Sequence, residues 1–207
     1  MAFRVVVLVS GSGTLLQSLI DACATGTVPA TIVAVGSDRP DAYGLHRAAT
    51  ANIPTFVHAM ERLHPLGSAE RVAWDRQMTE RVTAHQPDLV VLAGFMKLLD
   101  RPFLERFKGR IINTHPALLP SFPGARAVAD ALAAGVPSTG CSIFWVDEGV
   151  DTGTLIDQRV VPVLPTDDEP TLHERIKIVE RQLLCDTVAH LATAAERPDN
   201  RKLKENP

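Results

Sequence analysis

Hydrophobic residues are grouped along this chain in a way that predicts alternating strands and helices over its first two thirds. Four segments are built around a short apolar run and are interpreted as buried strands: Phe3–Val9, Thr31–Val35, Leu89–Ala93 and Arg110–Asn113. The longer segments between them mix apolar with polar positions and are interpreted as helices: Leu15–Ala24, Ala42–Ala51 and Ser68–His85. Apolar strands without polar alternation, separated by helices, indicate a mainly parallel sheet covered on both faces.

The pattern changes in the last third of the chain. Leu119–Gly124 is rich in proline and is predicted to be a loop, and Ala125–Ala134 a short helix. Two further strands are predicted at Ser142–Val146 and Leu155–Val163, joined by the polar loop Asp147–Gly153. Such a pair would extend the sheet in antiparallel fashion.

A long helix is predicted to close the domain. Thr171 and Glu174 have the spacing of a capping box, which places its start near Pro170. Its apolar face is predicted to comprise Leu172, Ile176, Val179, Leu183 and Leu191. We therefore expect one domain over residues 1–196 and a polar tail over 197–207. The predicted fold is a Rossmann-like α/β domain with helices on both faces of a mostly parallel sheet and an antiparallel C-terminal extension.

Composition and charge are those of an ordinary globular protein. The chain has 207 residues, 45% of them hydrophobic and 22% charged, with a formal net charge of −3. No basic cluster predicts nucleic-acid binding, and no apolar run is long enough to predict a signal peptide or a membrane span. Cys23, Cys141 and Cys185 lack metal or redox spacing, so we expect reduced thiols in a cytoplasmic protein.

The segment Ser10–Thr14, read as SGSGT, lies between a predicted strand and a predicted helix. Glycines there let the backbone approach a ligand, and free amides at a helix start attract anions. Leu16 stands where a dinucleotide fingerprint needs its third glycine, and the lysine of a triphosphate P-loop is absent. A monophosphate site is therefore favoured over a dinucleotide or triphosphate site, the alternative being a tight turn without a ligand.

Asn113 and His115 are two residues apart at the end of a predicted strand, so their side chains point the same way. A donor amide beside an imidazole can receive a negatively charged oxygen and move a proton. Asp151 adds a carboxylate that would orient the imidazole and favour its charged form. This set suits acyl transfer without a serine or cysteine nucleophile. The alternative is that His115, which precedes a proline, caps a loop and that Asp151 is a solvated turn residue.

Position favours the functional interpretation. Ligands of open α/β sheets gather beyond the carboxyl ends of the strands, where both the glycine loop and His115 are predicted to lie. The remaining histidines have no metal-ligand spacing and are interpreted as surface or packing residues, so no metal site is expected: His46, His58, His64, His85, His173 and His190.

These features together resemble the folate-dependent formyltransferase family. The segments that carry the resemblance span nearly the whole chain in order: 7–22, 90–99, 112–132, 138–163 and 173–181. The resemblance implies transfer of the formyl group of 10-formyltetrahydrofolate, as co-substrate, to the amine of glycinamide ribonucleotide in purine biosynthesis. The amine would attack the formyl carbon directly, which accounts for the missing nucleophile. Asn113 and protonated His115 would stabilise the tetrahedral oxyanion, and Asp151 would hold His115 and assist proton transfer.

The resemblance also implies the binding residues. The ribonucleotide and its phosphate would contact Gly13, Thr14, Leu15, Lys177 and Glu180. Folate would contact Arg71, Phe95, Met96, Lys97, Leu98, Leu99, Val146, Asp147, Glu148, Gly149 and Val150. Without the family match, core packing for Phe95–Leu99 and a solvated helix face for Lys177 and Glu180 would be preferred.

Two positions depart from the family pattern. Leu15 stands where the family usually has asparagine, and Lys97 replaces a common arginine, which loses a planar fork of donors. Both departures concern affinity rather than reaction type. The rival functions are a formyltransferase for another amine, a 10-formyltetrahydrofolate hydrolase and a nucleotide-binding module without catalysis. The sequence leaves open whether the chain works alone or as a homodimer.

Overall fold

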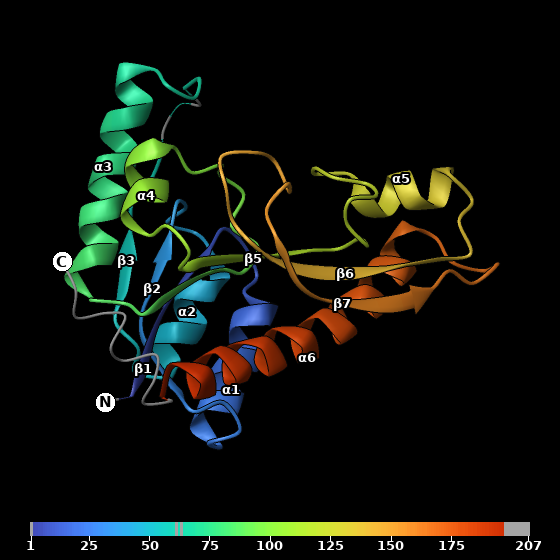
Figure 1. Cartoon of the computed structure of the whole chain (residues 1–207), viewed down its shortest axis with the longest axis horizontal. Coiled ribbons are helices and arrows are strands. Elements are labelled where there is room, and N and C mark those ends of the chain that lie inside the picture. The colour runs from blue at the N-terminus through green and yellow to red at the C-terminus, as the bar shows by residue number, and fades with distance from the viewer. Residues whose placement is uncertain (1, 61, 63, 197–207) are drawn as a thin grey trace.

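The computed structural model describes residues 2–60, 62 and 64–196 and arranges them around a seven-stranded sheet (Figure 1). The strand order is β3-β2-β1-β4-β5-β6-β7. The strands are β1 (Phe3–Val9), β2 (Ala30–Ser37), β3 (Thr55–Val57), β4 (Leu89–Leu92), β5 (Ile111–His115), β6 (Ser138–Trp145) and β7 (Leu155–Pro162). The first five strands pair in parallel, whereas β6 and β7 are antiparallel to their neighbours. The predicted fold class is confirmed.

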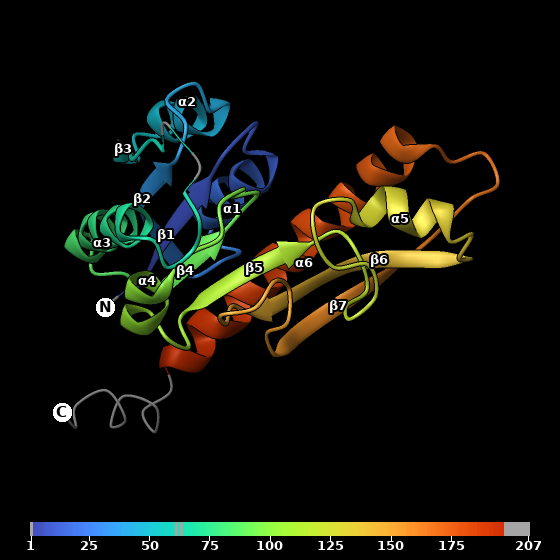
Figure 2. The same cartoon turned by 90° about the horizontal axis from the view of Figure 1, so that it is seen from above.

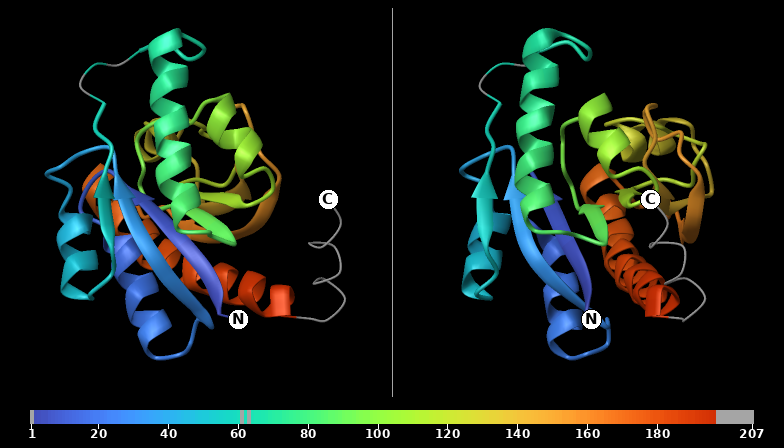
Figure 3. Two further views of the ribbon diagram at one scale, coloured as in Figure 1. Left: turned by 90° about the vertical axis from the view of Figure 1, so that its left-hand side faces the viewer. Right: turned by 60° about the vertical axis from the view of Figure 1, so that its left-hand side comes forward.

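Helices cover both faces of the sheet. They are α1 (Thr14–Ala24), α2 (Tyr43–Thr50), α3 (Ala69–Ala84), α4 (Arg101–Arg106), α5 (Ala127–Ala133) and α6 (Glu169–Glu196). Helices α1 and α6 lie on one face, and α3 and α4 lie on the other (Figure 2). Figure 3 shows α6 running beside α1 along that shared face.

The two layers explain why β1 reads as an uninterrupted apolar run from Val5 to Val9. Val5, Val7 and Val9 are buried with residues of α1 and α6. Val6 and Leu8 are buried with residues of α3 and α4. Successive side chains of a strand point to opposite faces, so a strand covered on both faces needs apolar residues at every position.

The structure corrects the sequence interpretation at three places. The short elements β3 and α4 were not predicted. The predicted capping box at Thr171 and Glu174 is wrong, because α6 begins at Glu169 and Asp168 serves as its cap. The Thr171 N–H donates to Asp168 Oδ1 at 2.9 Å, and the Asp168 N–H donates to Thr171 Oγ1 at 2.9 Å. This reciprocal pair satisfies the helix start before Glu174. The predicted tail lies outside the described residues.

The strand order reverses its direction at the boundary between β1 and β4. Strands β2 and β3 extend to one side of β1, and β4 and β5 extend to the other. A crevice at the carboxyl ends of the strands forms at such a switch point. The glycine loop follows β1 and the segment Ala93–Asp100 follows β4, so both border this crevice.

Candidate functional site

The backbone of the loop between β1 and α1 lies close to the backbone at the start of α2. Gly13 has a φ of 69°, and a Cβ at this position would lie 2.6 Å from Gly44 Cα at the start of α2. The Gly44 N–H donates to the Gly11 carbonyl at 3.0 Å. Among the described residues, no side chain caps α1 and its first turn holds no acidic residue. The first amides of α1 are therefore available to an anion.

Ser10 joins the ends of three strands beneath this loop. Its hydroxyl donates to Asp38 Oδ1, which follows β2, at 2.5 Å. The same oxygen accepts the N–H of Met96, which follows β4, at 2.8 Å. Asp38 is buried, and its Oδ2 lies 3.8 Å from Lys97 Nζ. A serine that both donates and accepts thus holds the loops of the crevice in one arrangement.

A pocket of about 480 Å³ opens beside the glycine loop. It is bordered by residues that follow β1, β2, β4 and β5 and by one face of α6. The lining comprises Ser10–Leu15, Asp38, Arg39, Ala93, Gly94, Met96, Lys97, Thr114, Pro116, His173, Lys177 and Glu180. The structure therefore brings together all five residues predicted to contact the ribonucleotide, from opposite ends of the chain.

Glu180 is the buried acid of this pocket. Burial raises the pKa of its carboxyl, while a hydrogen bond with Thr114 and the charges of Lys177 and Arg181 act in the opposite direction. A buried carboxyl that faces a pocket offers a strong hydrogen-bond acceptor to a ligand that carries hydroxyl groups. His173 also lines the pocket, which corrects its interpretation as a surface or packing residue. Burial lowers the pKa of its imidazole, and Lys177 lowers it further.

Strand β5 presents its last residues to both faces of the sheet. Thr114 faces α6 and lines the pocket, whereas Asn113 and His115 share the opposite face. Pro116, next to His115, lines the pocket as well. The predicted catalytic face and the pocket therefore adjoin at the carboxyl end of one strand.

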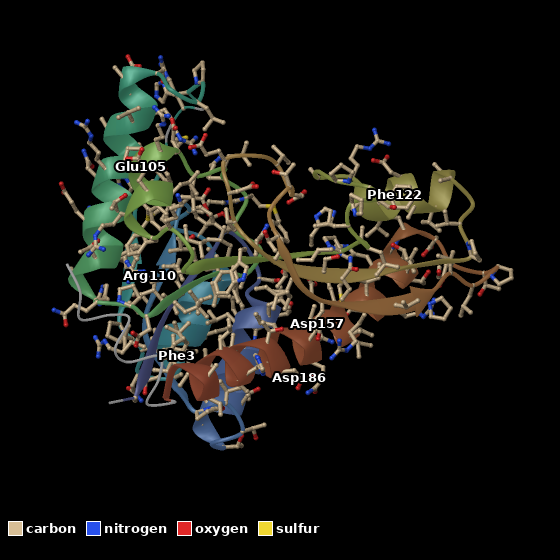
Figure 4. All side chains as sticks on the ribbon, in the orientation of Figure 1. Phe3, Glu105, Arg110, Phe122, Asp157 and Asp186 are labelled. Carbon is tan, nitrogen blue, oxygen red and sulfur yellow. The ribbon has the colours of Figure 1, made fainter. Side chains whose placement is uncertain are left out.

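His115 and Asp151 are in contact, as predicted. His115 Nδ1 lies 3.4 Å from Asp151 Oδ2, and both side chains are largely buried. His115 Nε2 lies 2.8 Å from the carbonyl oxygen of Phe122. The Gly124 N–H donates to Asp151 Oδ2 at 2.8 Å. Figure 4 labels Phe122 beyond the end of β5, far from Arg110 at its start.

In the loop between β6 and β7, residues Asp147–Val150 are exposed, and hydrogen bonds among the loop's own residues hold it. Asp147 Oδ1 accepts the N–H of Gly149 at 3.0 Å and the hydroxyl of Thr152 at 2.7 Å. Asp151 has a φ of 54°, which aspartate tolerates better than most residues. Because β6 runs antiparallel to β5, this loop starts near Ile112 and must fold back to bring Asp151 to the strand's end.

The segment Phe95–Leu99 is buried at its two ends and more exposed between them. Phe95 and Leu99 are buried, whereas Met96 is 75% and Leu98 is 48% exposed. Exposed apolar side chains beside a crevice are suited to contact an apolar ligand. Met96 and Lys97 also line the pocket of the glycine loop.

Arg71, which the resemblance assigns to folate binding, is 2% exposed and pairs with Asp75 inside the protein. Its contact with folate stays a prediction. Helix α3 turns it inward because Asp75, one turn later, offers a buried counter-charge. Asp38 and Thr114 were not predicted as site residues. Their position at or beyond strand ends was the available signal, but strand ends hold many polar residues that line no pocket.

Two structural observations limit the kinds of site in the described part of the chain. No cluster of three or more histidine, cysteine or acidic residues is arranged there to hold a metal ion. None of the helices described in residues 2–196 has the length and apolar character needed to cross a membrane.

The fold and the site place the chain among α/β enzymes with a nucleotide-type pocket at the switch point of the sheet. The chain belongs to the formyl transferase family, whose sequence pattern matches residues 3–188. It is 55% identical over 190 residues to a phosphoribosylglycinamide formyltransferase of Mycobacterium tuberculosis. The aligned residues cover 92% of this chain and 85% of that protein.

Two further relatives support the assignment. The chain is 44% identical over 179 residues to part of the trifunctional purine biosynthetic protein adenosine-3 of Drosophila melanogaster, covering 86% of this chain and 13% of that protein. Among solved structures, glycinamide ribonucleotide transformylase 1 of Symbiobacterium toebii superimposes with a TM-score of 0.85 at 40% identity. The superposition covers 93% of this chain and 89% of that one.

Proposed function

We propose that the protein transfers the formyl group of 10-formyltetrahydrofolate to the amine of glycinamide ribonucleotide. The observation that carries the proposal is the junction of a phosphate-type pocket with the Asn113, His115 and Asp151 group at the end of β5. The names of the relatives, which refer to this ribonucleotide, support the same substrate. The co-substrate and a cytoplasmic location remain predictions.

The ribonucleotide would lie in the pocket of about 480 Å³. Its phosphate would accept hydrogen bonds from the amides of Gly13, Thr14 and Leu15 at the uncapped start of α1. A backbone site of this kind does not depend on the side chain of Leu15. Glu180 would accept hydrogen bonds from the ribose hydroxyls, and Lys177 would add positive charge.

The chemistry would occur past the end of β5. The substrate amine would attack the formyl carbon, and the Asn113 amide with the Nε2–H of His115 would donate to the resulting oxyanion. The Phe122 carbonyl accepts that Nε2–H in this structure, so the loop would give up this bond when the intermediate forms. Asp151 would hold the imidazole and assist transfer of the amine proton to the leaving folate nitrogen.

Folate would lie between Phe95–Leu99 and the loop Val146–Val150. Met96, Leu98 and Val150 supply exposed apolar surface there, which would suit the flat ring system of the co-substrate. Bringing the amine and the formyl group into contact would itself supply much of the acceleration.

An absorbance assay of 10-formyltetrahydrofolate deformylation tests the proposal. We expect turnover that depends on glycinamide ribonucleotide. Equal turnover without the ribonucleotide would identify a hydrolase, with water as acceptor. If the folded protein turns over only with another amine, it is a formyltransferase of different specificity. No turnover with any acceptor would favour a binding module.

A further inference from the structure

Helix α2 holds the glycine loop, Ser10–Thr14, through hydrogen bonds to two of its carbonyl groups. The Gly44 N–H donates to the Gly11 carbonyl at 3.0 Å. The Arg47 guanidinium donates through Nε to the Ser12 carbonyl at 2.8 Å. None of the described residues that line the pocket comes from α2. The helix therefore acts on the loop from outside the pocket.

The direction of each carbonyl fixes the direction of the amide that follows it. The peptide bonds of the loop are trans, so the C=O and the N–H of each plane point to opposite sides. With the Gly11 and Ser12 carbonyls turned toward α2, the N–H groups of Ser12 and Gly13 point away from α2. Ser12 and Gly13 line the pocket, and among the described residues none accepts a hydrogen bond from either N–H. Both amides are thus left for a ligand in the pocket.

Arg47 is itself fixed by its neighbours. Its Nη1 donates to Gln17 Oε1 on α1 at 3.1 Å. Its guanidinium carbon lies 4.9 Å from the centre of the Tyr43 ring. Its Cδ would lie 3.5 Å from a Cβ at Gly13, so the stem of the side chain also packs against the loop. The planar fork of donors can reach α1 and the loop at once, which joins α1, α2 and the glycine loop in one unit.

We propose that Arg47 is a positioning residue for the substrate phosphate. It holds the Ser12 carbonyl away from the pocket and so keeps the Gly13 amide turned toward the phosphate, without contacting the ligand. The inference rests on the proposed function, because it assigns the glycine loop to the phosphate of the ribonucleotide. It adds a residue of α2 to a pocket that is otherwise built from strand ends, α1 and α6.

The test titrates inorganic phosphate into the wild-type protein and into Arg47→Met, and nuclear magnetic resonance follows the amide signals of Ser12 and Gly13. We expect the dissociation constant to rise about three- to tenfold in the variant, the scale of one lost hydrogen bond. KM for glycinamide ribonucleotide should rise by a similar factor. KM for 10-formyltetrahydrofolate should stay within about twofold and kcat should not change, because only binding of the phosphate is weakened.

The salt dependence separates an indirect role from a direct contact between Arg47 and phosphate. Loss of a charge contact matters less as salt is added, because the screening length falls from about 10 Å at 0.1 M to about 3 Å at 1 M. A misplaced amide weakens binding at any salt concentration. The dissociation constant of Arg47→Met should therefore still exceed that of the wild type at least about threefold at about 1 M salt. Arg39→Met is the matched control, because Arg39 lines the pocket and its effect should vanish at high salt.

A conservative variant and a second arginine complete the test. Arg47→Lys keeps a donor for the Ser12 carbonyl but lacks the planar fork, so its dissociation constant should lie between those of the wild type and Arg47→Met. Arg4→Met removes an arginine that also donates to backbone carbonyls, those of His85 and Gln86 at the opposite end of the sheet. It should lower the melting temperature and leave phosphate binding unchanged.

The outcomes separate this inference from the proposed function. Unchanged phosphate binding in folded Arg47→Met would overturn the inference, as would a loss that disappears at high salt or Ser12 and Gly13 signals that do not respond to phosphate in the wild type. If Arg47→Met does not fold, Arg47→Lys decides by the same comparison. A protein that binds phosphate through this loop but transfers no formyl group would overturn the proposed function and leave the role of Arg47 in place.

Discussion

His115 Nδ1 and Asp151 Oδ2 lie 3.4 Å apart, although 36 positions of sequence separate the two residues. His115 is the last residue of β5, and Asp151 belongs to the loop between β6 and β7. With Phe122 at Nε2, both ring nitrogens face oxygen acceptors. These two contacts fix the orientation of the imidazole at the carboxyl end of β5.

Asp151→Asn tests the carboxylate. Asparagine retains an oxygen to accept the Gly124 N–H, so the loop should keep its conformation while the charge is lost. We expect kcat to fall by at least about 100-fold, the usual scale of a positioned proton-transfer group. Steady-state kinetics measure it, with Glu105→Gln, an exposed acid on α4, as the control. A kcat within a few-fold of wild type would remove Asp151 from the mechanism.

Asn113→Ala tests the second oxyanion donor. Among the described residues, none forms a hydrogen bond with the side-chain amide of Asn113, so the substitution should cost little stability. We expect kcat to fall by about 100- to 1000-fold, as for loss of one such donor in other enzymes. Thr114→Val, on the opposite face of β5, should instead raise KM for the ribonucleotide. The idea fails if the two variants have the same kinetic profile.

Gly13→Ala tests the backbone of the phosphate-type loop. Gly13 has positive φ, and an added Cβ would meet Gly44 at 2.6 Å. We expect a loss of about 1–3 kcal/mol in the free energy of unfolding, measured in urea, from the left-handed conformation alone. Gly11→Ala is the matched control, because no described atom lies within 4 Å of a Cβ there. Equal stability of the two variants would contradict the close approach.

Glu180→Gln tests the buried acid. The folded-state pKa of Glu180 is raised, so the folded protein binds a proton more tightly than the unfolded chain does. That contribution to stability is present below the ordinary glutamate pKa and is lost as pH rises through the folded-state pKa. The variant should therefore melt at a higher temperature than wild type at neutral pH.

The pH dependence supplies the check on Glu180. The difference in melting temperature should shrink as pH is lowered from about 7 toward about 4.3, the ordinary pKa of glutamate. A difference that is constant over this range would show that the carboxyl does not titrate as expected. KM for the ribonucleotide should rise in the same variant, so stability and binding would change in opposite directions.

The thiols should be inert in the folded protein. Burial raises the pKa of Cys141 to about 12 and that of Cys23 and Cys185 to about 11. Thiolate is the reactive form, so little is present near pH 8. We expect a disulfide reagent to react slowly with the native protein and rapidly with all 3 cysteines after unfolding in guanidinium. Rapid native labelling would show that a thiol is accessible.

Much of the fold could be predicted from the sequence, because a strand that is buried on both faces has apolar residues at successive positions. Strand β1 was predicted with its observed bounds, since all its residues from Val5 to Val9 are buried. Strand β3 has three residues and α4 has six, which are too few to show a periodic pattern of apolar and polar positions. The cap Asp100 and the early proline of α4 were the only local signals of that helix.

Site residues at the ends of predicted strands could be predicted from the sequence. Residues that reach the site only through the packing of elements far apart in the chain could not. The contact between His115 and Asp151 agrees with the predicted group. Asp38 and His173 enter the pocket only because β2 and α6 converge on it. A charged residue on a polar helix is ordinarily exposed, so nothing local to Arg71 indicated that Asp75 and Leu98 enclose it.

Helix α6 links the order of synthesis to the appearance of the binding pocket. It supplies Glu180 to the pocket and packs against α1, β6 and β7. While a ribosome is still making the preceding strands, the α1 face of the sheet is covered only in part and the pocket lacks one wall. We expect the nascent chain to complete the pocket only when α6 emerges, and until then to expose apolar surface of the kind that chaperones recognise.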